Sequence, residues 1–162
     1  MGKKIYVIDT STLVYFYSDL KSPNILYSLF QDRIKIVPHV KNELLKLGKE
    51  KGFYDEVIAD IRSGFLQIEE VDIYNKRVRD FLVKFKRRLD IGERFSAALA
   101  LERGYELLID DWVAQQEMMF GLVGLTYKNA EWVLDCARKK HRIVKKEYRR
   151  LKNKLYNAKR RY

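Results

Sequence analysis

The chain has 162 residues, of which 47% are hydrophobic, and a formal net charge of +11. This length and composition predict a folded domain with a buried core and exclude a chain that is disordered throughout. No apolar run approaches the roughly 20 residues that span a bilayer, and the opening residues lack the apolar core of a signal peptide. The single cysteine, Cys136, excludes an internal disulfide or a zinc site built from cysteines. We therefore expect a cytoplasmic protein that does not engage a membrane.

The positive charge is concentrated at the C-terminal end. Residues 136–162 hold 13 Lys and Arg and one acid, Glu147, which gives this segment +12 and leaves residues 1–135 at −1. A block of this kind often contacts nucleic acid, although it can also be a solvated helix that only aids solubility. We divide the chain accordingly into a near-neutral domain, residues 1–135, and a basic helical extension, residues 136–162.

Apolar runs that end at polar or turn residues predict strands, and apolar residues at helical spacing predict the segments between them. We expect strands at residues 4–9, 34–37, 65–71, 106–109 and 122–125. We expect helices at residues 13–19, 23–30, 39–49, 53–62, 74–88, 93–103 and 113–120, and again from residue 127 almost to the end. Strands that alternate with helices indicate an α/β fold, with a parallel sheet of about five strands flanked by helices.

The first and fourth predicted strands both end at acids, Asp9 in one case and Asp110 and Asp111 in the other. A single Asp after a strand is commonly a helix cap, but parallel strands that end alike bring their acids to one edge of the sheet, where such sheets bind ligands. Glu43 and Glu93 stand near the starts of predicted helices, where an isolated acid is ordinarily a surface residue favoured by the helix dipole.

Carboxylates gathered within a few ångströms repel one another and raise one another's pKa unless a cation neutralises them. Hard divalent ions such as Mg²⁺ and Mn²⁺ prefer oxygen ligands of this type. A cluster of these acids therefore predicts a metal site. A cation there would bind a scissile phosphate, generate hydroxide from water and stabilise the leaving oxygen.

Four motifs resemble, in order and spacing, those of the PIN-domain family. They are VIDTSTL at residues 7–13, VPHVKNEL at 37–44, LDIGERFSAALA at 89–100 and LLIDD at 107–111. Each motif is short, but the ordered set covers residues 3–126 and is most similar to the toxin-like, VapC-like archaeal and bacterial branch. The resemblance implies a PIN-like fold. It also implies a divalent-metal-dependent endoribonuclease that hydrolyses RNA phosphodiester bonds, as a toxin or in RNA processing.

The same resemblance implies roles for single residues. The catalytic acids would be Asp9, Glu43, Glu93 and Asp111. The ligands of Mg²⁺ or Mn²⁺ would be Asp9, Glu93, Asp111 and, as an additional or substitute ligand, Asp110. Ser11 matches a small hydroxyl residue near the first Asp and would bind a ligand water or cap a helix. Asp90 is either a neighbour of the ligands or a surface acid, and Trp112 either stacks on a base or packs against the domain.

Two groups of basic residues are candidates for holding RNA. Arg87 and Arg88 close a basic run just before the third motif, and they either contact phosphates beside the cut or lie on a solvated helix face. In the extension, basic residues recur on more than one helical face, which suits sequence-independent contact with a phosphate backbone. These residues are Arg138, Lys139, Lys140, Arg142, Lys145, Lys146, Arg149 and Arg150.

Other functions fit the sequence less well. A phosphatase of the haloacid-dehalogenase type needs a second Asp two residues after the first, where this chain has Ser11, and no phosphate-binding glycine loop is present. His39 and His141 lack the paired spacing of metal ligands. The alternative function is a non-catalytic PIN-fold scaffold for RNA binding or assembly, although a scaffold has no need of a repulsive acidic cluster. By the resemblance, the partners would be RNA, an antitoxin protein and a second copy of the chain in a homodimer.

Overall fold

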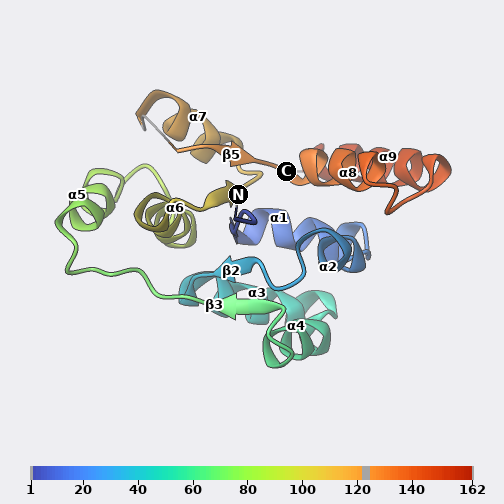
Figure 1. Cartoon of the computed structure of the whole chain (residues 1–162), viewed down its shortest axis with the longest axis horizontal. Coiled ribbons are helices and arrows are strands. Elements are labelled where there is room, and N and C mark those ends of the chain that lie inside the picture. The colour runs from blue at the N-terminus through green and yellow to red at the C-terminus, as the bar shows by residue number, and fades with distance from the viewer. Residues whose placement is uncertain (1, 122–124, 162) are drawn as a thin grey trace.

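Five strands form one parallel sheet in the order β3-β2-β1-β4-β5 (Figure 1). The computed structural model describes residues 2–121 and 125–161, and of residues 118–121 only the backbone. The strands are β1 (Tyr6–Ile8), β2 (Ile34–Ile36), β3 (Leu66–Ile68), β4 (Glu106–Leu108) and β5 (Tyr127–Lys128). This arrangement confirms the predicted α/β fold and its parallel sheet of five strands.

Helices connect the strands and flank the sheet (Figure 1). They are α1 (Thr10–Val14), which continues into the π-helical turn η1 (Tyr15–Asp19), α2 (Asn24–Phe30), α3 (Pro38–Lys51), α4 (Tyr54–Arg62), α5 (Lys76–Lys84), α6 (Ile91–Arg103), α7 (Trp112–Gly121), α8 (Ala130–Lys139) and α9 (Lys145–Lys159). Among the described residues, no helix is both long and apolar enough to cross a membrane.

Local sequence explains where the two helices that carry the second and third motifs begin and end. Pro38 stands at the first turn of α3, where its missing N–H is not needed, and Gly52 ends this helix with a φ of +84°. Helix α6 begins with a capping box: the Glu93 N–H donates to Asp90 Oδ1 at 2.8 Å, and the Asp90 N–H donates to Glu93 Oε2 at 3.0 Å. Gly104 ends α6 with a φ of +68°.

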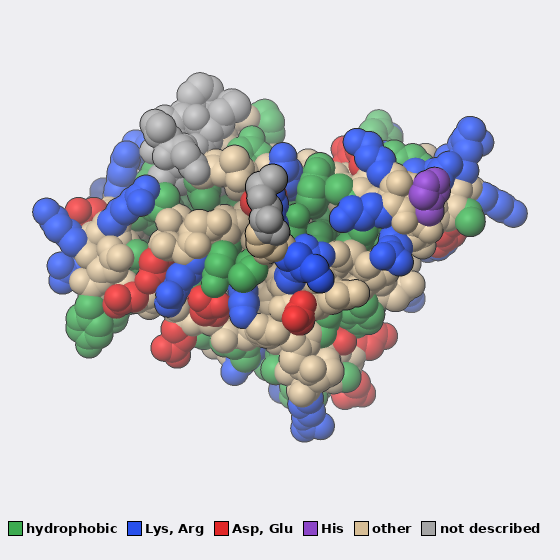
Figure 2. Space-filling view, viewed as in Figure 1, with side chains coloured by type: hydrophobic (Ala, Val, Ile, Leu, Met, Phe, Trp, Pro, Cys, Tyr) green, Lys and Arg blue, Asp and Glu red, His purple; other side chains and the backbone are tan. Residues whose placement is uncertain are grey.

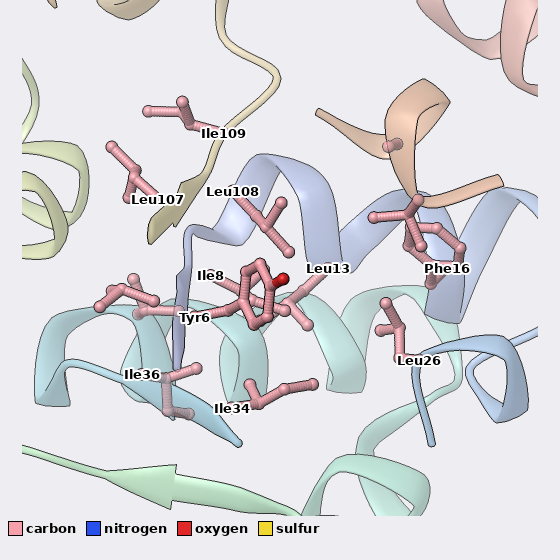
Figure 3. Packing of buried hydrophobic residues seen from close by; sticks show 14 of the residues in the cluster. Tyr6, Ile8, Leu13, Phe16, Leu26, Ile34, Ile36, Leu107, Leu108 and Ile109 are labelled. Carbon is pink, nitrogen blue, oxygen red and sulfur yellow. The ribbon is translucent and has the colours of Figure 1, made fainter. Parts of the chain in front are cut away.

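Strand pairing places the carboxyl ends of β1 and β4 side by side. Ile8 lies in register with Leu108, and the Asp9 N–H donates to the Leu108 carbonyl at 2.9 Å. The apolar side chains of these strands are buried and pack with those of α1 and β2, as Figure 3 shows for Leu13 and Ile34. Because β2 and β3 lie on one side of β1, and β4 and β5 on the other, the topology switches between β1 and β4. Ligands of open parallel sheets bind at such a switch point.

The fifth strand is not where the sequence predicts it. The expected segment at residues 122–125 lies largely outside the described residues, and β5 is Tyr127–Lys128 instead. Both residues of β5 are half-buried at the sheet edge, so they carry no alternation of apolar and polar side chains that a sequence could reveal. Helix α5 is also shorter than the predicted helix at residues 74–88. Asn75 sets its start by accepting from the Arg77 N–H at 2.9 Å, and residues 85–88 form turns instead of continuing the helix.

The basic extension is a helical hairpin rather than a single helix. Helices α8 and α9 pack side by side and are joined by a turn in which His141 has a φ of +54° (Figure 1). Leu151 and Leu155 of α9 are buried in the core that the rest of the chain shares, and α9 packs against η1. The domain boundary expected after residue 135 therefore falls inside α8, and the hairpin is built into the domain.

Gly48 lets α3 and α4 pack closely, which makes it a test of this packing. A Cβ at Gly48 would lie 2.8 Å from the Cα of Tyr54, so Gly48→Ala should force the two helices apart. We expect the free energy of unfolding to fall by about 1–2 kcal/mol, since the strain outweighs the ~1 kcal/mol that Ala gains in helix propensity. Chemical denaturation measures this change. Gly2→Ala is the control, because a Cβ there meets nothing within 4 Å. Equal stability of both variants would contradict the packing.

Candidate active site

Asp9 directly follows β1 and is only 3% exposed. Its Oδ2 accepts from the Ser11 Oγ at 3.0 Å and from the Ser11 N–H at 3.3 Å, so Asp9 itself caps α1. The Asp110 N–H in turn donates to Ser11 Oγ at 3.1 Å. Ser11 therefore links the Asp9 carboxylate to the chain that leaves β4, which fixes how the two strand ends face each other.

Glu43 reaches the same edge of the sheet from α3. Its half-buried carboxylate accepts a hydrogen bond from Thr10 Oγ1, on the first turn of α1. A Cβ at Gly92 would lie 3.0 Å from both carboxylate oxygens of Glu43. The glycine of the third motif thus allows the Glu43 carboxylate to lie directly against the first turn of α6.

Glu93 and Asp90 join the site through the capping box of α6. Glu93 is 8% exposed, whereas Asp90 is exposed. The negative charge of Asp90 raises the pKa of Asp9, of Glu43 and of Glu93. The sequence leaves the role of Asp90 open, and the structure places it among the site acids. The capping box was the available signal, because a residue that caps the helix must lie beside the acid three positions later.

Burial raises the pKa of the acids that this edge encloses. Burial first, and then the charge of Asp90, raise the pKa of Asp9 to about 7, although the hydrogen bonds from Ser11 oppose the shift. Burial is also the main cause that raises the pKa of Glu43, with Asp90 adding to it. These carboxylates therefore hold protons at a pH at which isolated carboxyl groups are ionised.

Glu93 is the most strongly perturbed of the site acids for which a pKa value is resolved. Burial first, and then the charges of Asp90, Asp9 and Asp111, raise its pKa to about 8. These mutual effects show that the acids from β1, α6 and the end of β4 lie within electrostatic reach of one another. Perturbed carboxyl groups of this kind cluster at functional sites, although structural networks also produce them.

The two adjacent acids after β4 have different surroundings. The Asp110 side chain is 1% exposed. Its Oδ2 accepts from Thr12 Oγ1 at 2.7 Å and from the Ala130 N–H at 2.9 Å, and its Oδ1 lies 3.0 Å from Lys159 Nζ. Hydrogen bonds from α1 and α8 thus hold Oδ2, and the Lys159 ammonium of α9 forms an ion pair with Oδ1, so this carboxylate ties the three helices to the end of β4.

Asp111 is half-buried, and its charge acts on Glu93. Its Oδ1 accepts from the Ala114 N–H at 2.8 Å, so it caps the first turn of α7. Of the pair that the sequence cannot separate, Asp111 is the member that belongs electrostatically with the other acids. The structure therefore brings together Asp9, Glu43, Glu93 and Asp111, with Asp90 added.

The chemistry of this donor set fits a hard divalent cation, because it consists of carboxylate oxygens, and a cation would replace the protons that their raised pKa values retain. Within residues 2–117 and 125–161, whose side chains are described, no three Asp, Glu, His or Cys side chains already form a metal-binding group. The carboxylates are near enough for their charges to interact, but they would have to move closer together to share a cation. Their repulsion is what a cation would relieve.

The predicted RNA-binding residues differ in solvent exposure and in whether they form ion pairs with acids of the chain. Arg88 lies 3.3 Å from Glu117 of α7, while Arg87 is exposed. Arg138 is half-buried, and Arg150 forms an ion pair with Glu147 at 2.5 Å. The other six residues of the extension are exposed, and Figure 2 shows Lys and Arg side chains gathered over the end of the molecule that α8 and α9 form. These six are Lys139, Lys140, Arg142, Lys145, Lys146 and Arg149.

Two cavities adjoin the acids. One, of about 700 Å³, is lined by Asp111, Ser11 and Trp112 among others, and the indole of Trp112 is exposed rather than packed. The other, of about 560 Å³, lies beside His39, one helical turn before Glu43. The sequence gives no signal for either cavity, because each is formed by segments that are far apart in the chain.

The raised pKa values predict how stability depends on pH in the absence of metal. An acid whose folded pKa is raised favours the folded state while it is protonated, and this contribution is lost as pH rises through about 7 for Asp9 and about 8 for Glu93. We expect the free energy of unfolding in EDTA to fall by roughly 1–3 kcal/mol between pH 6 and pH 8.5. Denaturation at both pH values measures this change. Asp9→Asn should reduce the dependence, whereas Asp55→Asn, at an exposed position of α4, should not. Equal stability of the wild type at the two pH values would refute the raised pKa values.

A family model described as a PIN domain matches residues 5–162, which is nearly the whole chain and includes the basic hairpin. A comparison with curated proteins found no match. The family match thus covers the acids at the sheet edge and the C-terminal helices together.

Several solved structures share the fold. PAE2754 from Pyrobaculum aerophilum aligns with a TM-score of 0.56 and 14% identity over 83% of this chain and 96% of that chain. DNA-bound VapBC from Salmonella typhimurium aligns with a TM-score of 0.53 and 15% identity over 79% of this chain and 99% of that chain. VapC20 from Mycobacterium tuberculosis is described as a toxin that cleaves the sarcin-ricin loop. It aligns with a TM-score of 0.53 and 15% identity over 75% of this chain and 98% of that chain. With the nearly complete family match, these likenesses establish that the chain belongs to the PIN-domain family and has the fold of the VapC toxins.

Proposed function

We propose that this protein is a divalent-metal-dependent endoribonuclease that hydrolyses phosphodiester bonds of RNA. The observation that carries the proposal is the set of mutually repelling carboxylates at the carboxyl edge of the sheet of a PIN domain. Keeping such acids buried without compensation costs stability, which a purely structural protein has no reason to bear. The acids are Asp9, Glu43, Glu93 and Asp111, assisted by Asp90.

In this proposal Asp9, Glu93 and Asp111 hold Mg²⁺ or Mn²⁺, since their charges act on one another and their oxygens suit these ions. Asp110 contributes structure rather than ligation, because Thr12 and the Ala130 N–H donate to its Oδ2 and the Lys159 ammonium forms an ion pair with its Oδ1. When bound, the cation supplies charge that neutralises the scissile phosphate and lowers the pKa of a water molecule.

The remaining side chains orient the carboxylates and move the proton. Ser11 holds Asp9 Oδ2, and Thr10 holds Glu43 Oε2, so both carboxylates have one defined orientation. Glu43 Oε1 remains available to accept a proton from the attacking water. Its raised pKa brings it closer to neutrality, where a general base acts well.

The basic face of the hairpin suits binding of the RNA backbone. Lys145 begins α9, and Lys159, which contacts Asp110, ends it. At 1.5 Å per residue, these two lysines are about 21 Å apart along the helix. A single strand could follow α9 from its exposed cations to the acids. Such contacts with phosphates provide affinity that does not depend on sequence.

The biological role that we propose is that of a cytoplasmic toxin ribonuclease or an RNA-processing nuclease. Three of the structures with this fold are VapBC assemblies, from Salmonella typhimurium, nontypeable Haemophilus influenzae and Rickettsia felis. By analogy we propose an antitoxin protein and a second copy of the chain as partners. The alternative, a scaffold that binds RNA without cutting it, is the outcome to exclude by experiment.

Cleavage of a mixed single-stranded RNA pool tests the proposed activity. The purified protein should cut the pool with Mn²⁺ or Mg²⁺ and not with EDTA. Asp9→Asn should reduce the rate at least about 100-fold, because it removes a ligand charge while keeping an acceptor for Ser11. Asp55→Asn is the matched control and should cut at the wild-type rate. If RNA is bound but no metal restores cutting, the scaffold becomes the better assignment.

Salt dependence tests the basic hairpin without changing its core. Lys146 and Arg149 are exposed on α9, so replacing both with Gln should weaken RNA binding in EDTA. The slope of log affinity against log salt should become less steep by about 1.4, the value for two lost phosphate contacts on a single strand. Gln at Lys46 and Lys49, two exposed cations of α3, changes the net charge equally and should leave the slope unchanged. Equal slopes for both double variants would show that the hairpin does not contact RNA.

A further inference from the structure

Trp112 is an exposed aromatic residue beside the acids. It is the first residue of α7, follows Asp111 directly and is 68% exposed, and its neighbour Val113 is 58% exposed. The side chain therefore contributes little to the core, which excludes the packing role that the sequence left open. Single exposed apolar residues are common on protein surfaces, so the surroundings of Trp112 must decide whether it has a role.

The surroundings form a cavity of about 700 Å³, within the range of roughly 300–1,000 Å³ that small-molecule sites occupy. Ser11 and Asp111, which belong to the acidic site, line this cavity. Trp112 provides an aromatic wall, and Lys51 and Lys159 add positive charge to the lining. Aromatic, apolar and cationic groups next to the acids match the parts of a nucleotide, which has a flat base and a charged phosphate.

Lys159 has capacity to contact a phosphate as well as Asp110. Its ammonium group has three donors, and the ion pair with Asp110 uses one side of it. The side chain remains 34% exposed and lines the cavity. It also stands at the end of α9, so the cavity continues the basic surface of the hairpin toward the acids.

We propose that Trp112 is a stacking platform for the base of a nucleotide next to the scissile phosphate of single-stranded RNA. The inference rests on the proposed ribonuclease function and deepens it by naming unpaired RNA as the substrate class and one subsite. Every base has a π-face, so this platform accepts any base, but the base must be unpaired to reach the indole. Charge favours RNA over an apolar peptide, because the cavity joins an acidic metal-type site to a basic helix.

Fluorescence isolates this contact, since the chain has two tryptophans. Trp132 is stacked on Phe30 with ring centroids 6.4 Å apart and lies 6.0 Å from the ring of Tyr6. Trp132→Phe leaves Trp112 as the reporter. In EDTA, an eight-nucleotide oligouridylate should quench its emission, whereas an abasic ribose-phosphate oligomer of equal length should not. Should Trp132→Phe fail to fold, the difference between titrations of the wild type and Trp112→Phe reports the same contact.

Affinity provides the second measurement. Trp112→Ala should weaken binding of the oligouridylate about 10-fold and leave binding of the abasic oligomer unchanged, and Trp112→Tyr should restore most of the loss. Val83→Ala, at a 74% exposed position of α5, is the control. Equal quenching by both oligomers, or unchanged affinity of Trp112→Ala, would overturn the platform. So would a change of Trp112 emission with protein concentration alone, which would indicate a contact between copies of the chain.

The outcomes for the platform and for the nuclease are separable. Quenching and loss of affinity in a protein that cuts no RNA would support the platform and refute the proposed function. Cutting that continues normally in Trp112→Ala, with unchanged affinity, would refute the platform alone.

Discussion

The site depends first on the parallel pairing of β1 with β4. The hydrogen bond from the Asp9 N–H to the Leu108 carbonyl, at 2.9 Å, sets how far each strand extends beyond the shared edge. Ser11 then joins the Asp9 carboxylate to the backbone of Asp110, so the orientation of Asp9 and the path of the chain after β4 are determined together. A shift of one residue in this register would turn the buried side chains of β4 to the opposite face and move Asp111 away from Glu93. The sheet thus determines which acids repel one another.

The buried acids at this edge of the sheet differ in how far protein donors compensate for their burial. Asp110 is almost fully buried, but hydroxyl and amide donors bind its Oδ2 and the Lys159 ammonium forms an ion pair with its Oδ1, as buried charges require. Asp9 and Glu93 are also buried, but their protein donors do not offset burial and the charge of Asp90, and the pKa of each is raised to about 7 and about 8. The acid that holds helices together is therefore compensated, whereas Asp9 and Glu93, which we assign to chemistry, are not. Gly92 contributes to the crowding of these acids, because its lack of a side chain allows the Glu43 carboxylate to lie against α6.

The sequence predicts the elements that have strong local signals. The apolar runs before Asp9 and Asp110 reveal β1 and β4, and helical spacing reveals α3 and α6. Features that arise from tertiary contacts were missed or left open. A two-residue edge strand such as β5 has too few residues to show a pattern, and adjacent Asp110 and Asp111 look alike until Lys159 and Glu93 show which way each faces. The role of Asp90 depends on charges from three segments that meet only in the folded chain.

The C-terminal hairpin shows why a division by charge misleads. One face of α9 carries Leu151 and Leu155 into the core, while the other carries exposed cations. At the end of the same helix, Lys159 contacts Asp110, whose backbone N–H donates to Ser11. Removing the hairpin would therefore expose apolar surface and release Asp110, and through Ser11 it would disturb Asp9. Any contact of RNA with α9 is linked to the acids by a continuous series of packed and hydrogen-bonded groups, so substrate binding and site geometry cannot be assigned to separate parts of this chain.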